Sequence, residues 1–398
     1  MNGDWLTVPL EEACDIEYGT RVVKKRDAGT LYPVYGGGGA TFFVDQYNRE
    51  DCTIVSRFGM SEECVRHIGG RFFLNDSGLS VAPKNQQKLT KRFVDHLLLA
   101  NSYKIYRLGR GAAQKNLDVN LFRKILVSFP QSIEEQIRIV AILDEAFQGI
   151  DTAVANTEQN LANTREIFEN YRDGIFSAQV EGWHSVELGE LCSIKHGFAF
   201  KSEFFTTEGD YIVLTPGFFW EHGGFRDQGK KTKYYEGEIP DGYLLEKGEF
   251  LFAMTEQAAG LLGSSLVVPE SNRYLHNQRL GLVQVKNGIE WRNDFFFHQF
   301  NTPKFRAAVQ ATASGAKVRH TSPKKLCAIP VVYPPSREEQ ISVADKLNGL
   351  WEETQRLEAI YQQKLTALAE LKQSLLQKAF SGELTASKAE AAVEEATV

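Results

Sequence analysis

The chain has 398 residues, too many for one compact core, and its 42% hydrophobic and 24% charged residues are ordinary for a globular protein in water. No apolar run is long enough to cross a membrane and the N-terminal residues do not form a signal-peptide pattern, so we expect a cytoplasmic protein with no membrane partner. Five scattered cysteines and eight dispersed histidines exclude a disulfide scaffold and the common zinc motifs.

The net charge of −6 is unevenly distributed along the chain. Residues 1–130 contain 18 basic and 14 acidic residues, and residues 181–335 contain 17 of each. Residues 131–180 contain 3 basic and 9 acidic residues, and residues 336–398 contain 7 and 11. The acidity therefore lies in two segments, and the first long block is mildly basic.

The first block, residues 1–131, mixes short strand-like runs and glycine-rich turns with one amphipathic helical pattern at residues 91–104. Its densest glycine run, YPVYGGGGATFF, includes Gly37 and Gly38 and lets the backbone approach a phosphate or a base edge closely. The run is neither a Walker A loop nor a G-x-G-x-x-G motif, and a flexible hairpin loop is the alternative interpretation.

Polar residues follow strand-like runs in this block. Arg57 lies in SRFGMS, Asn75 and Ser77 lie in LNDSG, and Gln114 and Lys115 lie in RGAAQKNLD. Arginine and amide side chains can read base edges with two hydrogen bonds, and lysine can neutralise a phosphate. Each residue taken alone also fits an ordinary solvated turn.

A long helix is predicted for residues 132–180. Ser132 and Glu135 form a capping-box pattern, and apolar residues then recur at spacings of three and four. The apolar seam includes Leu143, Ile150, Tyr171 and Ile175. At about 1.5 Å per residue the helix would be roughly 65 Å long. Because a long seam needs a partner, we expect a coiled coil; two helices on separate cores are the alternative.

The second block, residues 181–335, repeats the frame of the first. WLTVPLEEACDIEYG from Trp5 aligns with WHSVELGELCSIKHG from Trp183 at an offset of 178. Asn75 aligns with Asn277 at an offset of 202, so about two dozen extra residues lie between these points in the second block. A helical pattern at residues 293–309 follows, as in the first block.

The second block also places polar residues at matching positions. Those in AMTEQAAG and LHNQRLG suit base-edge contacts, and those in SGAKVRHTS suit phosphate neutralisation. These residues are Thr255, Gln257, Asn277, Gln278, Arg279, Lys317, Arg319 and His320. Their recurrence in both blocks favours a binding role over unrelated surface turns.

A second long helix, residues 336–383, copies the first at a constant offset of 204. SREEQISVADKLN matches SIEEQIRIVAILD, which pairs Gln136 with Gln340, and Ser336 with Glu339 repeats the cap. Its apolar seam includes Leu347, Leu357, Leu368, Leu371 and Leu375. The Ala- and Glu-rich residues 384–398 are predicted to be a disordered tail.

The predicted fold class is α+β: two α/β blocks separated by two long helices that form an antiparallel coiled coil, with a pseudo-twofold internal repeat. The sequence contains no Asn/Asp-Pro-Pro-aromatic tetrapeptide of an amino-methyltransferase, since YPPS at Tyr333 differs at its first and last positions. No catalytic triad and no metal site can be nominated, so we expect a chain that is not an enzyme.

Together these motifs resemble the specificity subunit of Type I restriction–modification systems. The resemblance rests on FPQSIEEQIRIVAILD and YPPSREEQISVADKLN at the starts of the two helices, on the Phe-Ser pair that ends each helix, and on YPVYGGGG. It covers residues 1 to about 385. It implies two target-recognition domains, residues 1–131 and 181–335, which each read one half of a bipartite double-stranded DNA target, while the paired helices set the spacer.

The resemblance also implies partners: two methyltransferase (modification) subunits and, in the full complex, restriction/translocase subunits. Those partners, and not this chain, would bind S-adenosylmethionine, ATP and magnesium. Candidates for subunit docking and coiled-coil packing are Gln136, Leu143, Ile150, Gln340, Leu347, Leu357, Leu368 and Leu375.

Two alternatives to this interpretation are considered. The first is an orphan specificity subunit, or one used for swapping recognition domains; the presence of both blocks and both helices counts against a truncated form. The second is a fused DNA methyltransferase or nuclease, which would need a cofactor motif that the sequence lacks.

Overall fold

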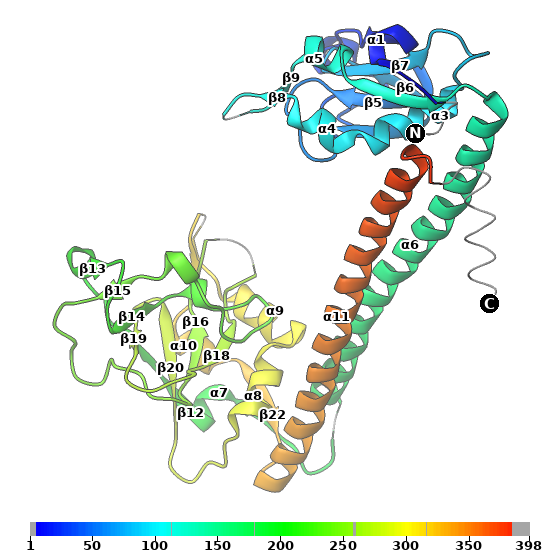
Figure 1. Cartoon of the computed structure of the whole chain (residues 1–398). Coiled ribbons are helices and arrows are strands. Elements are labelled where there is room, and N and C mark those ends of the chain that lie inside the picture. Colours follow the sequence, from blue (N-terminus) through cyan, green and yellow to red (C-terminus); the bar gives the residue numbers. More distant parts are fainter. Residues whose placement is uncertain (1–4, 113, 179, 258–259, 316, 384–398) are drawn as a thin grey trace. The chain divides into compact units, whose positions relative to one another are not determined.

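The computed structural model describes residues 5–383 apart from 113, 179, 258–259 and 316, and the predicted tail at 384–398 lies outside the described residues. The chain forms two compact units (Figure 1). The first unit joins the residues up to Glu158 to those from Gln362 onward, and the second is Gln159–Tyr361. Each unit contains one block and a part of each long helix. We call the blocks the first head (residues 5–131) and the second head (residues 180–335).

The first head is built on one mixed sheet. Its elements are β1 (Trp5–Pro9), α1 (Leu10–Ala13), β2 (Cys14–Tyr18), α2 (Lys24–Asp27), β3 (Tyr32–Tyr35), β4 (Phe43–Val44), β5 (Arg49–Ser56), β6 (Val65–Leu74), β7 (Gly78–Pro83), α3 (Lys91–Ala100), α4 (Ser102–Arg107), β8 (Gly109–Arg110), β9 (Asn116–Leu117), α5 (Val119–Arg123) and β10 (Leu126–Pro130). Six strands form a sheet in the order β2-β7-β5-β6-β3-β4, in which only β3 and β6 pair in parallel. Strand β1 pairs with β10, and β8 with β9.

The second head has the same frame and an additional sheet. Its elements are β11 (His184–Glu187), α7 (Leu188–Leu191), β12 (Cys192–His196), η1 (Ser202–Phe204), β13 (Phe205–Thr206), β14 (Tyr211–Leu214), η2 (Pro216–Phe218), η3 (Gly229–Lys231), β15 (Tyr234–Tyr235), β16 (Phe250–Ala253), β17 (Thr255–Glu256), β18 (Ser265–Val267), β19 (Tyr274–His276), β20 (Leu280–Val285), α8 (Asn293–Phe300), α9 (Pro303–Ala311), β21 (Arg319–His320), α10 (Pro323–Cys327) and β22 (Pro330–Tyr333). One sheet has the order β12-β20-β16-β18 and the other β13-β15-β14-β19. Strands β13, β14 and β15 lie between Gly197 and Asn277, where the alignment predicts the extra residues.

The predicted internal repeat is confirmed by equivalent contacts in the two heads. Strand β1 pairs with β10 in the first head, and β11 pairs with β22 in the second. The Gly19 N–H donates to the Gly78 carbonyl at 3.0 Å, and the Gly197 N–H donates to the Leu280 carbonyl at 3.2 Å. A Cβ atom at either glycine would overlap the backbone of the asparagine turn opposite, so both positions require glycine.

The two long helices, α6 (Ile133–Ser177) and α11 (Arg337–Phe380), run antiparallel, as predicted. In the second unit Arg165 pairs with Glu358, and the Phe168 ring lies 4.9 Å from the Trp351 ring. Residue numbers rise along α6 while their partners' numbers fall along α11. In the first unit the early part of α6 meets the late part of α11, where Asp151 pairs with the Lys372 ammonium at 2.9 Å.

The predicted apolar seam is confirmed at most positions and wrong at two. Residues Leu143, Ile150 and Leu347 are buried, and Leu357, Leu368 and Leu375 are half-buried. Tyr171 and Leu371 are instead 45% and 47% exposed. Near the end of α11 the buried residues are Leu376 and Ala379, so the contact face of the helix is turned away from Leu371.

Each long helix begins at the predicted serine cap. The Ser132 and Ser336 hydroxyls accept the backbone N–H of Glu135 and Glu339, both at 3.3 Å. In a capping box the Glu135 carboxylate would also accept the backbone N–H of Ser132. Here that carboxylate instead forms an ion pair with Arg138 at 2.9 Å. The cap therefore fixes the start of the helix through the serine.

Gln136, one turn into α6, joins the first head to this helix. Its side-chain amide is fully buried and makes three hydrogen bonds. Its oxygen accepts the Thr90 N–H at 2.8 Å, and its NH₂ group donates to the carbonyls of Lys88 and Pro130 at 2.8 and 2.9 Å. The amide thus links the loop before α3, the end of β10 and the helix.

Gln340 makes the equivalent three bonds in the second unit. Its oxygen accepts the Arg292 N–H, and its NH₂ group donates to the carbonyls of Glu290 and Pro334, all at 3.0 Å. Both glutamines are buried inside their own unit. The repetition of this glutamine in the two copies is therefore explained by packing within each unit.

The amphipathic patterns at 91–104 and 293–309 are each predicted as one helix, and this is wrong. Each is two helices, α3 with α4 and α8 with α9, broken at Asn101 and near Asn301. The Asn101 amide donates to the Leu97 carbonyl and the Asn301 amide to the Phe297 carbonyl, both at 2.8 Å. An asparagine side chain that bonds to the last turn competes with the next helical bond and ends the helix.

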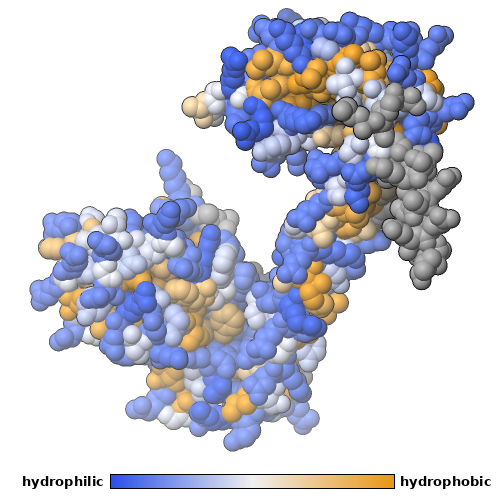
Figure 2. All heavy atoms as spheres, in the orientation of Figure 1, coloured by the Kyte–Doolittle hydropathy of each residue, from blue (hydrophilic) through white to orange (hydrophobic). Residues whose placement is uncertain are grey.

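Charged and polar residues cover much of the visible surface of each head, and apolar residues are exposed in smaller areas and on the helices (Figure 2). The large exposed apolar residues of the two long helices are Ile137, Ile167, Tyr171, Ile360 and Leu371. Among the described residues, no helix is long and apolar enough to span a membrane.

Replacing Gln136 with alanine should lower the free energy of unfolding by about 2–4 kcal/mol, because a buried N–H and two carbonyls lose their partner. Urea unfolding followed by circular dichroism measures this change. Gln148→Ala is the matched control, since Gln148 is exposed on the same helix, and should cost less than about 0.5 kcal/mol. Equal effects of the two substitutions would contradict the role of Gln136.

Candidate nucleic-acid interface

In the first head, the glycine-rich loop meets the turn between β6 and β7. The Gly37 N–H donates to the Ser77 hydroxyl oxygen at 3.1 Å, and the Ser77 N–H donates to the Asn75 side-chain oxygen at 2.9 Å. The Ser77 hydroxyl also bonds to Asn75. A Cβ atom at Gly36 would overlap both side chains, whereas one at Gly38 would meet open space. The structure thus brings Gly37, Asn75 and Ser77 together and leaves Gly38 accessible.

Arg57 is held beside this turn by its own backbone and side chain. Its N–H donates to the Ser77 carbonyl at 2.8 Å, and its guanidinium donates to the Asp76 carbonyl at 2.9 Å. The guanidinium lies over the rings of Tyr18 and Phe58, 5.1 and 4.3 Å from their centroids. An arginine fixed in this way retains N–H donors for a ligand.

Gln114 and Lys115 lie on the β8–β9 hairpin, next to the turn that follows Arg57. The Met60 N–H donates to the Lys115 carbonyl at 2.9 Å, and the Lys115 ammonium lies 4.0 Å from the Tyr106 ring centroid. The aromatic rings of Tyr18, Phe58 and Tyr106 were missed by the sequence reasoning. Phe58 could have been found from its position next to Arg57.

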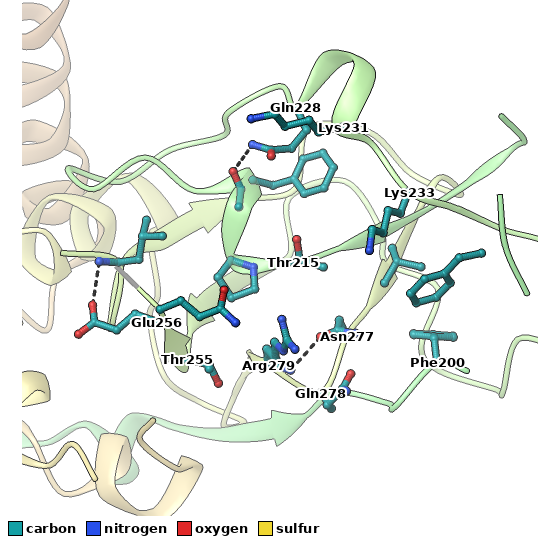
Figure 3. Close-up of a pocket in the computed structure, with 17 residues that line it drawn as sticks. Phe200, Thr215, Gln228, Lys231, Lys233, Thr255, Glu256, Asn277, Gln278 and Arg279 are labelled. Carbon is teal, nitrogen blue, oxygen red and sulfur yellow. Dashed lines mark hydrogen bonds between the residues drawn. The ribbon is translucent and has the colours of Figure 1, made fainter. Parts of the chain in front are cut away.

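In the second head, several predicted residues line one cavity of about 520 Å³ (Figure 3). They are Thr255, Gln257, Asn277, Gln278 and Arg279. Asn277 is buried, and its side-chain oxygen accepts the Arg279 N–H at 3.1 Å, as Asn75 does with Ser77 in the first head. Within the described part of the chain, the buried Gln278 side-chain oxygen has no hydrogen-bond partner, so its capacity to accept a hydrogen bond is unused.

The opposite side of the cavity is basic and was missed by the sequence reasoning. Figure 3 shows Gln228, Lys231 and Lys233 across the cavity from Asn277 and Arg279. The Gln228 amide bonds to the Gly217 carbonyl, which leaves the two exposed lysines as the charged groups of this wall. The run QGKKTKYY, residues 228–235, was a signal for them.

The carboxylate of Glu256, which also borders the cavity, is neutralised inside the protein. Its side chain is 1% exposed, and one of its oxygens accepts the N–H groups of Gly260, Leu261 and Leu262 at 3.0, 3.0 and 2.8 Å. The Arg319 guanidinium lies 3.3 Å from its other oxygen. Arg319, expected at a phosphate, therefore has an internal partner and fastens the segment that follows β17.

Lys317 and His320 lie outside the cavity lining, on the hairpin that ends in β21. His320 and Ser314 exchange backbone hydrogen bonds of 3.0 and 2.9 Å, and the Lys317 side chain is exposed. Gly315 has a φ of +101° and Gly111, in the equivalent hairpin of the first head, has +118°. Both hairpins need a left-handed residue, which explains the predicted glycine-led motif.

Among the described residues, no group of three or more His, Cys, Asp or Glu side chains is placed to hold a metal ion. Burial raises the pKa of the thiols of Cys14 and Cys192 to about 12, so both stay protonated at neutral pH. Burial also lowers the pKa of His276 to about 4, which keeps this imidazole neutral. These side chains belong to the packing of the two heads.

Two curated proteins, both named specificity subunits, are similar to this chain. The Type I restriction enzyme EcoBI specificity subunit of Escherichia coli is 27% identical over 226 residues, which are 56% of this chain and 44% of that protein. The StySPI specificity subunit of Salmonella potsdam is 25% identical over 327 residues, which are 77% of this chain and 68% of that protein. The first alignment thus spans less than half of its relative.

Two solved structures show the fold. One comes from a study of complex assembly and conformational transition of the type I R-M system; its TM-score is 0.73 and its sequence identity 16%. The match covers 96% of this chain and 99% of the chain in that structure. The HsdS subunit from Thermoanaerobacter tengcongensis has a TM-score of 0.53 and 17% identity, and covers 96% and 98%.

The family match covers both heads. The model of the Type I restriction modification DNA specificity domain matches residues 2–161 and again residues 180–367, so one domain model fits each copy of the internal repeat. Together the two matches include most of the chain. This chain belongs to the family of Type I restriction–modification DNA specificity domains.

Proposed function

We propose that this chain is the sequence-recognition subunit of a Type I restriction–modification complex and that each head reads one half of a bipartite double-stranded DNA target. One observation carries the proposal: side chains able to read base edges gather at repeat-related turns in both heads, at Asn75 in the first and Asn277 in the second. The double match of the family model supports the same division of labour.

The chemistry of each site fits a division between base and phosphate contacts. Arg57 in the first head, and Gln278 and Arg279 in the second, can form paired hydrogen bonds with base edges in the major groove. Lys231 and Lys233 add positive charge opposite Arg279 and suit a DNA backbone. Because Glu256 is neutralised internally, the cavity as a whole favours an anionic ligand.

In this proposal the antiparallel helix pair sets the spacer between the half-sites and docks two methyltransferase subunits, with restriction/translocase subunits in the full complex. The exposed apolar residues of the helices, among them Ile167 and Ile360, suit such contacts. Both curated relatives are named specificity subunits, which supports a non-catalytic chain acting in the cytoplasm. S-adenosylmethionine, ATP and magnesium would then be bound by the partner subunits.

The test is single-molecule methylome sequencing of a host that expresses this chain with its methyltransferase subunit. We expect methylation within a split motif, two short specific blocks around a gap of fixed length. Expression of the methyltransferase subunit alone is the control and should leave this motif unmethylated. A continuous motif, or the same motif without this chain, would argue against the proposal.

Inserting four residues after Glu158 in α6 should change the preferred spacer and leave both half-sites unaltered, because the insertion lengthens the helix by about 6 Å between the two units. A second variant with a matching insertion after Tyr361 in α11 keeps the two helices equal in length. Methylome sequencing of both variants measures the gap. An unchanged gap in both variants would rule out the helices as the spacer.

Arg279→Ala should weaken recognition at one position of the second half-site by roughly 5- to 150-fold, the range for losing one bidentate base contact. Methylation rates on duplexes with single base changes measure this loss. Arg273→Ala is the matched control, since Arg273 is paired with Glu270 and does not line the cavity. A uniform loss on all sequences would instead make Arg279 a phosphate contact.

A further inference from the structure

Residues 215–226 form a loop of the second head that begins at the cavity. Its first four residues, 215–218, line the cavity wall opposite Arg279. The chain returns at Arg226, whose N–H donates to the Phe218 carbonyl at 2.8 Å. This hydrogen bond connects the cavity wall at residues 215–218 to the returning side of the loop.

The tip of the loop joins a column of contacting rings, in which the pairs that involve Trp351 are tilted by 48°. The rings of Trp220 and His222 lie 5.9 Å apart and nearly parallel, at 11°. His222 lies 5.6 Å from Trp351, and Trp351 lies 4.9 Å from Phe168. Trp351 belongs to α11 and Phe168 to α6, so the column connects the loop to both long helices within the second unit.

Each end of the column carries an arginine. The Arg226 guanidinium lies 4.6 Å from the Trp220 ring, and the Arg172 guanidinium lies 5.4 Å from the Phe168 ring. Arg172 is 6% exposed, so its contact with the ring is shielded from water. Cation–aromatic contacts of this kind strengthen when they are desolvated, which favours a fixed column.

The loop backbone is also held in place. The Ser264 hydroxyl donates to the Trp220 carbonyl at 2.6 Å. Gly223 and Gly224 have φ values of +94° and +92°, and a Cβ atom at Gly223 would overlap the Asn301 side chain. These contacts hold the loop backbone against the head, while the Trp220 and His222 side chains stay exposed at the surface.

The first unit has the equivalent helix position, but its corresponding loop, residues 36–42 between β3 and β4, is shorter. With the offset of 204, Trp351 corresponds to Phe147. The Phe147 ring contacts the His96 ring at 5.4 Å and the Lys372 ammonium at 4.8 Å, and neither of these residues lies at the candidate interface. The loop at 215–226 is part of the long connection between β14 and β15, residues 215–233, whereas residues 36–42 alone connect the equivalent strands β3 and β4 of the first head.

We infer that Trp220, His222 and Trp351 are positioning residues for the second half-site: they fix the cavity wall at residues 215–218 to the helix pair. Base preference at the second half-site then depends on Trp351, a side chain of α11 that does not line the cavity. The inference rests on the proposed function, and it adds that the helices take part in reading the second half-site and not the first.

The test compares Trp351→Ala, Trp351→Phe and His222→Ala in the full chain with its methyltransferase subunits. Methylation of a duplex library with randomised half-sites measures the discrimination between bases at each position. We expect Trp351→Ala and His222→Ala to reduce discrimination in the second half-site roughly two- to tenfold, the range for one aromatic pair, and Trp351→Phe to restore it. The first half-site and the spacer should not change.

Phe147→Ala is the matched control and should leave both half-site preferences intact. His222 lies at the tip of a surface loop, so its substitution keeps the test valid if Trp351→Ala fails to fold. Trp351→Ala and His222→Ala would overturn the inference if they instead lowered methylation on all sequences and left the base preferences unchanged. That result would show that the column only stabilises the fold. Failure of the wild-type chain to give a split motif would instead overturn the proposed function.

Discussion

The side-chain amide of one buried glutamine fixes each head to the helix that follows it. A buried amide is costly unless its hydrogen bonds are made, so a geometry that satisfies all three bonds is strongly preferred. Gln136 makes these bonds to the loop before α3 and to the strand before α6, and Gln340 repeats them. The orientation of each head on its helix, on which any reading of DNA depends, follows from this constraint.

A second constraint shapes the candidate interface. In each head an asparagine accepts the N–H of the residue two positions on, and the glycine that directly follows the second strand of the head, Gly19 or Gly197, packs against that turn. The turn is therefore rigid, while the side chains next to it, Ser77 in one head and Arg279 in the other, can vary. A rigid turn with different neighbouring side chains lets each head present its own polar groups from the same frame.

The two heads use the common frame differently. In the first head Arg57 lies on two aromatic rings, and Asn75 and Ser77 are already bonded to each other. In the second head strands β13 and β14 and the long β14–β15 connection contribute to the lining of a cavity with a lysine-bearing wall. We therefore expect the two half-sites to differ both in sequence and in the way they are contacted.

The sequence by itself determined the repeat, the starts of the long helices and the glycine and asparagine turns, because caps and turns depend on residues close together in the chain. Tertiary structure decided which of the predicted side chains line the cavity of the second head. In the sequence Arg319 fits a phosphate contact, but in the structure its guanidinium pairs with Glu256. Lys231 lines the cavity because the second sheet brings it there. Leu371 fits the apolar period yet faces solvent, because the partner helix selects which face of a helix is buried.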